Sequence, residues 1–271
     1  NKNDGRSIGL VPTMGALHQG HISLVDRAVA ENDITLVSVF VNPTQFNNPE
    51  DLRTYPRCEE QDFELLAKSG VTAVFAPTAE EIYPDGGKSA SSHVYDLGTA
   101  AEVMEGKYRP GHFQGVAQIV SLLFRLSRAT RAYFGEKDFQ QIAVIRNMVE
   151  TENIDIEIVA CPIHRAEDGL ALSSRNALLT ESQRKNAPEI YRALSESVEY
   201  SRSHSVDATH RMVTERLDAV PEMKVEYFEI VDGRTLLPVE EWDESPYIVG
   251  CITVYNGKVR LIDNICYRRG C

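Results

Sequence analysis

Residues 10–25 read LVPTMGALHQGHISLV, and the order of apolar and turn residues in this stretch indicates the fold class. Its first residues end a short apolar run, Ile8–Val11, and a loop with Gly15 follows. From Gly20 to residue 32, apolar side chains recur at helical spacing. This order predicts a strand, a loop and a helix. His18 and His21 lie where the loop becomes the helix, so a ligand at this junction would meet two imidazoles.

The same alternation continues along the chain. ITLVSVFV, residues 34–41, is a nearly continuous β-branched and aromatic run, typical of a strand buried on both faces. A helix is predicted near Glu59–Ser69, and after it the predicted elements are a strand in VTAVFAP, a helix in GVAQIVSLLFRLS, a strand in RAYFG, a helix in DFQQIAVIRNMVE and a strand in IDIEIVACPI. About five strands alternating with helices predict an α/β fold, a Rossmann-like doubly wound parallel sheet.

The pattern changes after about residue 164. Thr180 and Gln183 form a capping-box pattern that predicts the start of a helix, and VDATHRMVTERLDAV predicts a second one. KVEYFEIVD and YIVGCITVYNGKVRLID are typical of antiparallel strands, with Asn256-Gly257 as a hairpin turn. We therefore expect two domains, residues 1–164 and a smaller α+β domain of residues 165–271.

Composition limits the partners. The net charge is −12, from 28 Lys and Arg against 40 Asp and Glu, which argues against nucleic acid but permits a small anion in a local pocket. The five cysteines are scattered and lack metal-ligand spacing, which favours a reducing cytoplasm. No apolar run approaches the roughly 20 residues of a membrane span. The chain does not begin with Met, so we expect that an N-terminal piece is missing or processed.

The loop before the first helix has the chemistry of an anion site. Ligands of open parallel sheets bind beyond the carboxyl ends of the strands, and amides at a helix N-terminus attract negative charge. Gly15 and Gly20 would let the backbone approach a ligand closely, and His18 and His21 can point the same way. This arrangement could hold a triphosphate, although it matches neither GxGxxG nor GxxxxGK[ST]. The alternative is a plain turn with two surface histidines.

HQGH resembles the HxGH signature of the nucleotidyltransferase and class I aminoacyl-tRNA synthetase superfamily, and VPTMGALHQGH is similar to the pantoate–β-alanine ligase family within it. Further stretches carry the resemblance almost to the C-terminus: VSVFVNPTQF, YPR, EGKYRPGHFQGV, YFGEKDFQQ, DGLALSSRN and RLIDN. The resemblance implies condensation of pantoate with β-alanine, driven by ATP through a pantoyl-adenylate, with release of pyrophosphate and AMP. The product, pantothenate, is vitamin B5, and the pathway is that of coenzyme A biosynthesis.

The resemblance also implies roles for individual residues. The catalytic residues it implies are His18, His21, Lys137, Ser173, Ser174 and Arg175. The ATP-binding residues are Met14, Gly15, Ala16, Leu17, His18, Gln19, Gly20, His21, Gly135, Glu136, Lys137, Asp138, His164, Leu172, Ser173, Ser174 and Arg175, with His164 contributing its backbone. The pantoate and β-alanine residues are Gln45, Gln141, Pro12, Met14 and Asn42, and Glu105 and Arg109 are expected to line the pocket.

These residue types suit the chemistry. Lys137 can meet a phosphate as a point charge, and the hydroxyls and guanidinium of the Ser-Ser-Arg stretch suit a mobile loop over the β- and γ-phosphates. Neutral amides can donate to and accept from a hydroxy acid without competing as nucleophiles. Taken singly, each of these residues could also be an ordinary solvated side chain.

Mg²⁺ is the implied metal, and Asp62 is its candidate ligand by resemblance alone, with a solvated helix-face acid as the alternative. The family also implies a homodimer, and its members normally carry a further segment before IGLVPTMG. Two other functions stay open: a nucleotidyltransferase that moves AMP onto a phosphate, and an RNA-binding module descended from a synthetase. The acidity of the chain argues against the second.

Overall fold

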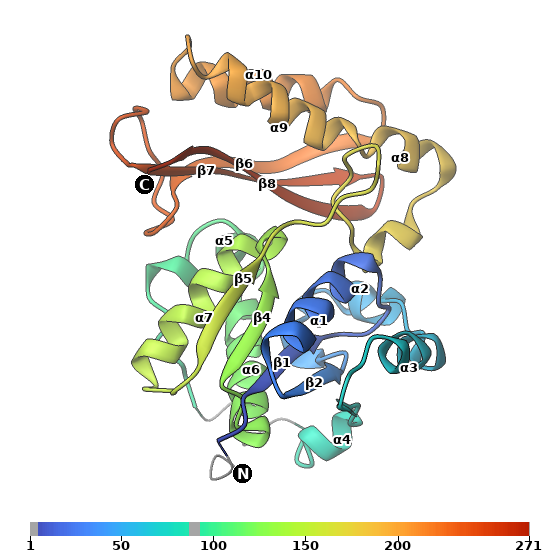
Figure 1. The fold of residues 1–271 in the computed structure, drawn as a ribbon. Helices are drawn as coiled ribbons and strands as arrows, with labels where there is room; N and C mark the ends of the chain where they lie inside the picture. Colours follow the sequence, from blue (N-terminus) through green and yellow to red (C-terminus); the bar gives the residue numbers. More distant parts are fainter. Residues whose placement is uncertain (1–4, 87–92, 271) are drawn as a thin grey trace. The chain divides into compact units, whose positions relative to one another are not determined.

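The structure is a computed structural model that describes residues 5–86 and 93–270 (Figure 1). Its residues divide into two compact units. The first unit runs to Glu136 and resumes over Gln140–Pro162, and the second comprises Lys137–Phe139 and the chain from Ile163 onward. The boundary after residue 164 that the sequence suggests stays a prediction about folding domains. Cys271 lies outside the described residues.

The first unit is built on a five-stranded sheet in the order β3-β2-β1-β4-β5, and every pair of neighbours is parallel. The strands are β1 (Ile8–Thr13), β2 (Ile34–Val39), β3 (Ala73–Phe75), β4 (Arg131–Gly135) and β5 (Glu157–Cys161). This confirms the predicted doubly wound parallel sheet. β1 lies at the centre, with β2 on one side and β4 on the other, so the loop after β1 leaves the sheet where the strand order reverses.

The helices of the first unit follow the predicted alternation (Figure 1). They are α1 (Gln19–Glu31), α2 (Pro49–Thr54), α3 (Glu59–Lys68), α4 (Ala79–Ile82), α5 (Glu105–Tyr108), α6 (His112–Ser127) and α7 (Phe139–Thr151). Short 3₁₀ turns lie at η2 (Pro43–Gln45) and η4 (Thr99–Ala101), and a third, η5 (Glu136–Asp138), carries Lys137 and Asp138, which belong to the second unit. The long helices were predicted. α2, α4 and α5 were not, because helices this short contain too few residues for an apolar period to appear.

A buried cluster holds α1 and α3 against the sheet, with Val25 and Leu66 packed in one core with Val11 and Val37. Tyr133 on β4 lies fully buried in the same cluster. Its hydroxyl accepts a hydrogen bond from Asn32 Nδ2 (2.7 Å) and donates one to Glu31 Oε2 (2.9 Å), and burial raises the pKa of Tyr133 to about 12. These bonds fix the C-terminal end of α1 to the sheet.

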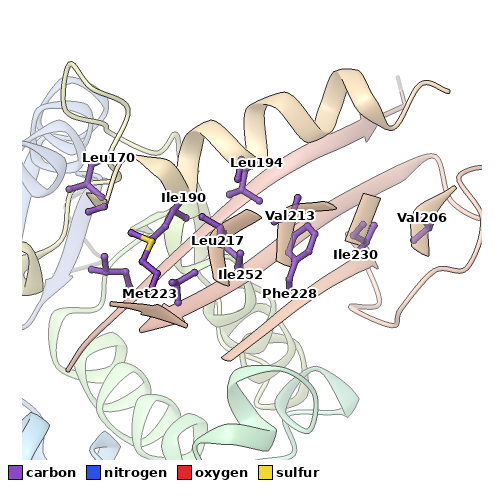
Figure 2. Packing of buried hydrophobic residues seen from close by; sticks show 14 of the residues in the cluster. Leu170, Ile190, Leu194, Val206, Val213, Leu217, Met223, Phe228, Ile230 and Ile252 are labelled. Carbon is purple, nitrogen blue, oxygen red and sulfur yellow. The ribbon is translucent and has the colours of Figure 1, made fainter. Parts of the chain in front are cut away.

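The second unit is an antiparallel sheet with helices packed on it. Its strands, in the order β6-β7-β8, are β6 (Met223–Asp232), β7 (Tyr247–Asn256) and β8 (Val259–Arg269). Its helices are α8 (Glu181–Asn186), α9 (Glu189–Tyr200) and α10 (Val206–Asp218), and a 3₁₀ turn, η6 (Ser174–Leu178), precedes them. Figure 2 shows the core between helices and sheet, where Leu194 and Leu217 pack with Phe228 and Ile252. The predicted α+β class is confirmed.

Two local predictions in the second unit are confirmed. Asn256-Gly257 makes the β7–β8 hairpin, with Gly257 at φ +59°, as predicted. The Thr180–Gln183 capping box is also present, but the helix it opens ends at Asn186. Pro188 has no N–H to continue the helical hydrogen bonds, and a new helix, α9, begins after it.

Candidate active site

His18 and His21 close the N-terminus of α1 together. Nδ1 of His18 accepts a hydrogen bond from the Gly20 N–H (3.1 Å), and Nδ1 of His21 accepts one from the His18 N–H (3.3 Å). The result is a reciprocal capping box made by imidazoles, with the ring centroids 4.0 Å apart. The two rings are therefore held in one orientation by the backbone that carries them.

This capping box determines which ring nitrogen carries the proton. A nitrogen that accepts a hydrogen bond is unprotonated, so each neutral ring carries its proton on Nε2. Protonation of either ring at Nδ1 would replace an acceptor by a donor that faces another N–H. The capping box therefore uses Nδ1 of both rings as acceptors and assigns the proton of each neutral tautomer to Nε2.

The amides of the preceding loop bond to protein atoms. The N–H groups of Ala16 and Leu17 donate to the carboxylate of Asp62 on α3, and the N–H of Gly15 donates to Oγ1 of Thr13 (3.2 Å). The sequence indicated that loop amides would attract an anion. In the structure these three amides bond to protein atoms, so the predicted phosphate-binding role of His18 and His21 stays a prediction.

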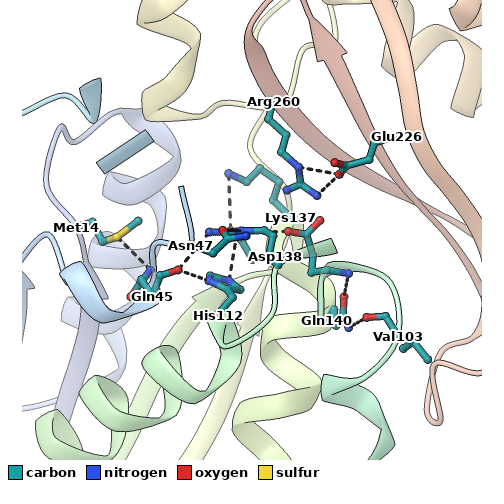
Figure 3. A network of polar contacts seen from close by, with 12 residues as sticks. Met14, Gln45, Asn47, Val103, His112, Lys137, Asp138, Gln140, Glu226 and Arg260 are labelled. Atoms are coloured by element: carbon teal, nitrogen blue, oxygen red, sulfur yellow. Dashed lines mark hydrogen bonds and ion pairs between the residues drawn. The ribbon is translucent and has the colours of Figure 1, made fainter. Parts of the chain in front are cut away.

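Gln45 lies in the loop after β2, next to this first loop. Its side-chain Nε2 is 3.2 Å from Sδ of Met14, and the residue is 8% exposed (Figure 3). Met14 belongs to the loop that carries the histidines, and Pro12 lies half-buried in β1 before it. The predicted acid-binding and phosphate-binding residues of the first unit are thus brought together.

The orientation of the Gln45 carboxamide is set by Asn42. Oδ1 of Asn42 accepts from the Tyr83 hydroxyl (2.7 Å) and from the hydroxyl and N–H of Thr44 (3.0 and 3.4 Å). Its Nδ2 donates to the Gly115 carbonyl (3.0 Å) and to Oε1 of Gln45 (3.1 Å). Because an N–H and a carbonyl fix the two ends of Asn42, the Gln45 oxygen must face it and the Gln45 NH₂ must face away.

A charged cluster surrounds the backbone of Gln45. His112 Nδ1 donates to the Gln45 carbonyl (2.8 Å), which leaves Nε2 of the neutral ring to accept from the Arg109 guanidinium (3.3 Å). Arg109 also pairs with Glu105 (3.3 Å) and donates to Oδ1 of Asn47 (3.4 Å). A half-buried guanidinium therefore lies beside the predicted substrate residue.

The two neighbouring glutamines of α7 differ. Gln140 is 5% exposed, and its side chain donates to the Val103 carbonyl (2.7 Å, Figure 3). It also donates to the Ala100 carbonyl (2.8 Å) and accepts from the Glu105 N–H (3.0 Å). Because its side chain is bound to three backbone groups, Gln140 has a structural role. Gln141, the predicted substrate residue, is half-buried, and its role stays a prediction.

The second unit contains the GEKD lysine. The Lys137 ammonium is 3.7 Å from Oδ2 of Asp138, with the Lys137 side chain 20% exposed (Figure 3). Asn264 Nδ2 donates to the Lys137 carbonyl (3.1 Å), and the adjacent Asp263 holds both Nη groups of Arg165 (2.6 and 2.8 Å). Burial raises the pKa of Asp263 against the opposing effect of Arg165. The RLIDN stretch thus supports the backbone of Lys137.

The Ser-Ser-Arg stretch of the second unit lies at η6. The Ser173 hydroxyl accepts from the Arg175 N–H (3.3 Å), Ser174 is buried and Arg175 is half-buried. Leu172 donates its N–H to the His164 carbonyl (3.0 Å), while the His164 side chain is exposed. The mobility expected for this loop stays a prediction.

The sequence did not single out Tyr83 or His112. Tyr83 lies beside Asn42 only through the fold, although its YPD context gives a turn signal. His112 lies inside a quoted motif, but its bond to Gln45 joins positions far apart in the chain. No group of three or more His, Cys, Asp or Glu side chains is placed to hold a metal ion in residues 5–86 and 93–270. Within the same ranges no helix is long and apolar enough to cross a membrane.

The fold and the site together define a class. The central strand of the parallel sheet is followed by a helix whose N-terminus is capped by the two histidines of HQGH, the junction where open α/β sheets bind their ligands. A family model described as Pantoate-beta-alanine ligase matches residues 1–266. The chain therefore belongs to the pantoate–β-alanine ligase family and is an enzyme of the acid–amino acid ligase class.

Individual relatives agree over nearly the whole chain. The chain is 58% identical to the pantothenate synthetase of Porphyromonas gingivalis over 264 residues, 97% of this chain and 92% of that one. A crystal structure of pantothenate synthetase from Thermus thermophilus superposes with a TM-score of 0.91 at 46% identity, covering 97% of this chain and 94% of that one. A pantoate-beta-alanine ligase from Francisella tularensis, complexed with beta-gamma ATP and beta-alanine, gives a TM-score of 0.78 at 37% identity, covering 97% and 90%.

Proposed function

We propose that this chain makes pantothenate from pantoate and β-alanine, with ATP converted to AMP and pyrophosphate through a pantoyl-adenylate. One observation carries the proposal: Gln45, the candidate acid-binding residue, contacts through Met14 the same loop that presents the two imidazoles. A single loop thus joins a site for a hydroxy acid to a site for phosphates. The ligand complex of the Francisella tularensis relative supports ATP and β-alanine as ligands of this family.

In the proposed first step, a carboxylate oxygen of pantoate attacks the α-phosphorus of ATP. A bond forms from that oxygen to phosphorus, and the bond from phosphorus to the bridging oxygen breaks, which releases pyrophosphate. Negative charge builds on the phosphoryl oxygens, so catalysis consists mostly of positioning and neutralisation. His18 and His21 serve as Nε2–H donors to those oxygens, held in register by their capping box.

The other predicted phosphate ligands belong to the second unit. Lys137 supplies a positive charge, and Ser173, Ser174 and Arg175 supply two hydroxyls and a guanidinium, as the family resemblance implies. The predicted ATP-binding role of Gly135 and Glu136, at the end of β4, belongs to the same proposal. Mg²⁺, when bound with ATP, would neutralise part of the phosphate charge, and Mg²⁺ commonly binds mainly through nucleotide phosphates.

Gln45 and Gln141 are proposed to bind pantoate. Because Asn42 takes the oxygen of the Gln45 carboxamide, Gln45 offers its NH₂ group to a substrate oxygen. This polarity suits a carboxylate or hydroxyl oxygen, which can accept from it.

In the second step, the amine of β-alanine attacks the acyl carbonyl, and the bond from that carbon to the AMP oxygen breaks. No general base is assigned to this step among residues 5–86 and 93–270, so the amine is proposed to arrive deprotonated and to release its one excess proton to solvent after the attack. The Arg109 guanidinium, held by Glu105 beside Gln45, provides a positive charge for a substrate carboxylate.

The test is product analysis together with isotope exchange. ATP, pantoate and β-alanine should give pantothenate, AMP and pyrophosphate, and pantoate alone should support exchange between ATP and labelled pyrophosphate. Exchange that requires a phosphorylated acceptor would instead identify a phosphate-directed nucleotidyltransferase. Salt-sensitive RNA binding without exchange would favour the RNA-binding alternative.

We also propose a cytoplasmic homodimer formed through the first unit. Phe63 on α3 and Val74 and Phe75 on β3 are exposed at the edge of the parallel sheet, where apolar side chains and an open strand favour pairing. The four cysteines within the described residues are free thiols, which suits a reducing compartment. Light scattering on the purified chain tests the dimer, and a monomeric mass at micromolar concentration would contradict it.

A further inference from the structure

Asp62 is a buried carboxylate that binds the loop between β1 and α1. It is 1% exposed, its Oδ2 accepts the N–H of Ala16 (2.8 Å) and its Oδ1 accepts the N–H of Leu17 (2.7 Å). Removing a carboxylate this completely from water is unfavourable unless hydrogen bonds compensate. The two amides supply that compensation, so the bond pair is a specific link from α3 to the loop.

The backbone of the loop is shaped around this carboxylate. Gly15 has φ +76° and Ala16 has φ +49°, and left-handed conformations are unfavourable for a residue such as Ala unless neighbouring contacts hold them. In this conformation the N–H groups of Ala16 and Leu17 both point at the Asp62 carboxylate. A Cβ on Gly15 would lie 3.0 Å from Asp62 Oδ2 and 3.1 Å from Val39, so glycine permits the close approach.

We propose that Asp62 is a positioning residue that holds Gly15–Leu17 in this conformation and thereby sets the direction of the His18 and His21 rings. The loop enters His18 immediately after Leu17, and His18 begins the capping box. This inference rests on the proposed function, because the direction of the rings matters only if they act on phosphates. It gives Asp62 a role different from that of magnesium ligand: both oxygens already bind amides at a site closed to water, whereas Mg²⁺ retains several waters.

The variant D62N, made in the full chain, tests the inference. Asn has the same shape, but its NH₂ end would face one of the two N–H groups, so one hydrogen bond is lost and a repulsion appears. We expect kcat for pantoate-dependent ATP–pyrophosphate exchange to fall on the order of 100-fold, because a small misplacement of a catalytic group lowers the rate by about that factor. KM for pantoate and the half-saturating Mg²⁺ concentration should change less than about threefold, because neither is bound by Asp62 in this account.

Two further variants serve as a control and as a second test. Glu60 is exposed on the same turn of α3, so E60Q should leave exchange at the wild-type rate. G15A pushes a methyl group toward Asp62 from the loop side, so it should lower kcat in the same way, and its effect should not add to that of D62N. If D62N does not fold, as judged by circular dichroism, G15A decides the question: wild-type exchange in G15A overturns the inference.

Other outcomes are equally decisive. Exchange in D62N within twofold of wild type overturns the inference, and so does a lost rate that returns when Mg²⁺ is raised, which would identify a metal ligand. Hydrogen exchange of the Ala16 and Leu17 amides gives a readout without catalysis: it should accelerate in D62N while that of the later turns of α1 does not. If the wild type lacks pantoate-dependent exchange, the proposed function fails, and amide protection alone then decides whether Asp62 holds the loop.

Discussion

His18 and His21 act as acceptors for the backbone before they act on any ligand, since Nδ1 of each ring accepts one N–H at the start of α1. An imidazole in this position has two separable functions. Nδ1 caps the helix, and Nε2–H is proposed to donate to the ligand. A substitution that keeps one nitrogen position and removes the other can separate them.

His18→Asn should keep the cap and lose the donor. The Asn Oδ1 lies near the place of Nδ1, and Asn is among the preferred N-cap residues, so the melting temperature should match that of the wild type. Exchange should fall on the order of 100-fold, the range found when one charge-stabilising donor is removed. His18→Ala should lose exchange equally and about 1 kcal/mol of stability as well. Equal stabilities of the Asn and Ala variants would contradict the capping role.

Tyr83→Phe should weaken pantoate binding without touching the substrate. The variant removes the strongest donor to Asn42 Oδ1 and loosens the hold that Asn42 has on the Gln45 carboxamide. About 1 kcal/mol per hydrogen bond corresponds to a rise in pantoate KM of roughly fivefold, with kcat little changed. Tyr255→Phe, an exposed tyrosine on β7, is the matched control. A Tyr83→Phe enzyme that loses kcat and keeps KM would assign Tyr83 to the chemistry instead.

Substitutions of the two adjacent glutamines of α7 should have different effects, one on stability and the other on pantoate binding. Gln140→Ala leaves two buried carbonyls and one N–H without their partner, so it should lower the free energy of unfolding by about 2–4 kcal/mol. Gln141→Ala should leave the melting temperature unchanged and raise the pantoate requirement. Chemical denaturation and steady-state kinetics on both variants check this. The reverse pattern would show that the substrate residue was assigned one position too far along α7.

These glutamines also show where sequence reasoning reaches its limit. The strand and helix alternation and the HxGH junction are local patterns, so the parallel sheet and the α1 N-terminus could be predicted. Two identical side chains in a row give no signal of which one faces the interior. That depends on the carbonyls of Ala100 and Val103, which only the fold brings near.

Asp62 shows the same limit over a longer distance. Its partners lie 46 and 45 residues earlier in the chain, and no short motif records that pairing. The sequence therefore could not indicate the hydrogen bonds of Asp62. The family resemblance implied a magnesium ligand, whereas the contacts lead to the proposal of a positioning residue.

The stability of the second unit should fall at low pH through Asp232. Burial opposes ionisation of this carboxyl, but hydrogen bonds from Ser245, Thr235 and Arg234 outweigh it and lower the pKa from 3.8 to about 2. A lowered folded-state pKa contributes stability that is complete above the unfolded value and disappears as pH falls through the folded one. Asp232→Asn should therefore cost about 1–2 kcal/mol at pH 6 and almost nothing near pH 2. A difference from wild type that does not vary with pH would refute this assignment.

Asn264→Ala should test whether β8 supports the lysine of the GEKD turn. Asn264 reaches no substrate in this account, and its amide donates to the main chain of Lys137. Losing that bond frees the turn that carries the ammonium group, so kcat for exchange should fall about tenfold, the equivalent of about 1.4 kcal/mol. Lys137→Met should fall much further, and the double variant should be no worse than Lys137→Met alone, because Asn264 acts through the lysine. Additive losses would mean that Asn264 acts on the reaction by a separate route.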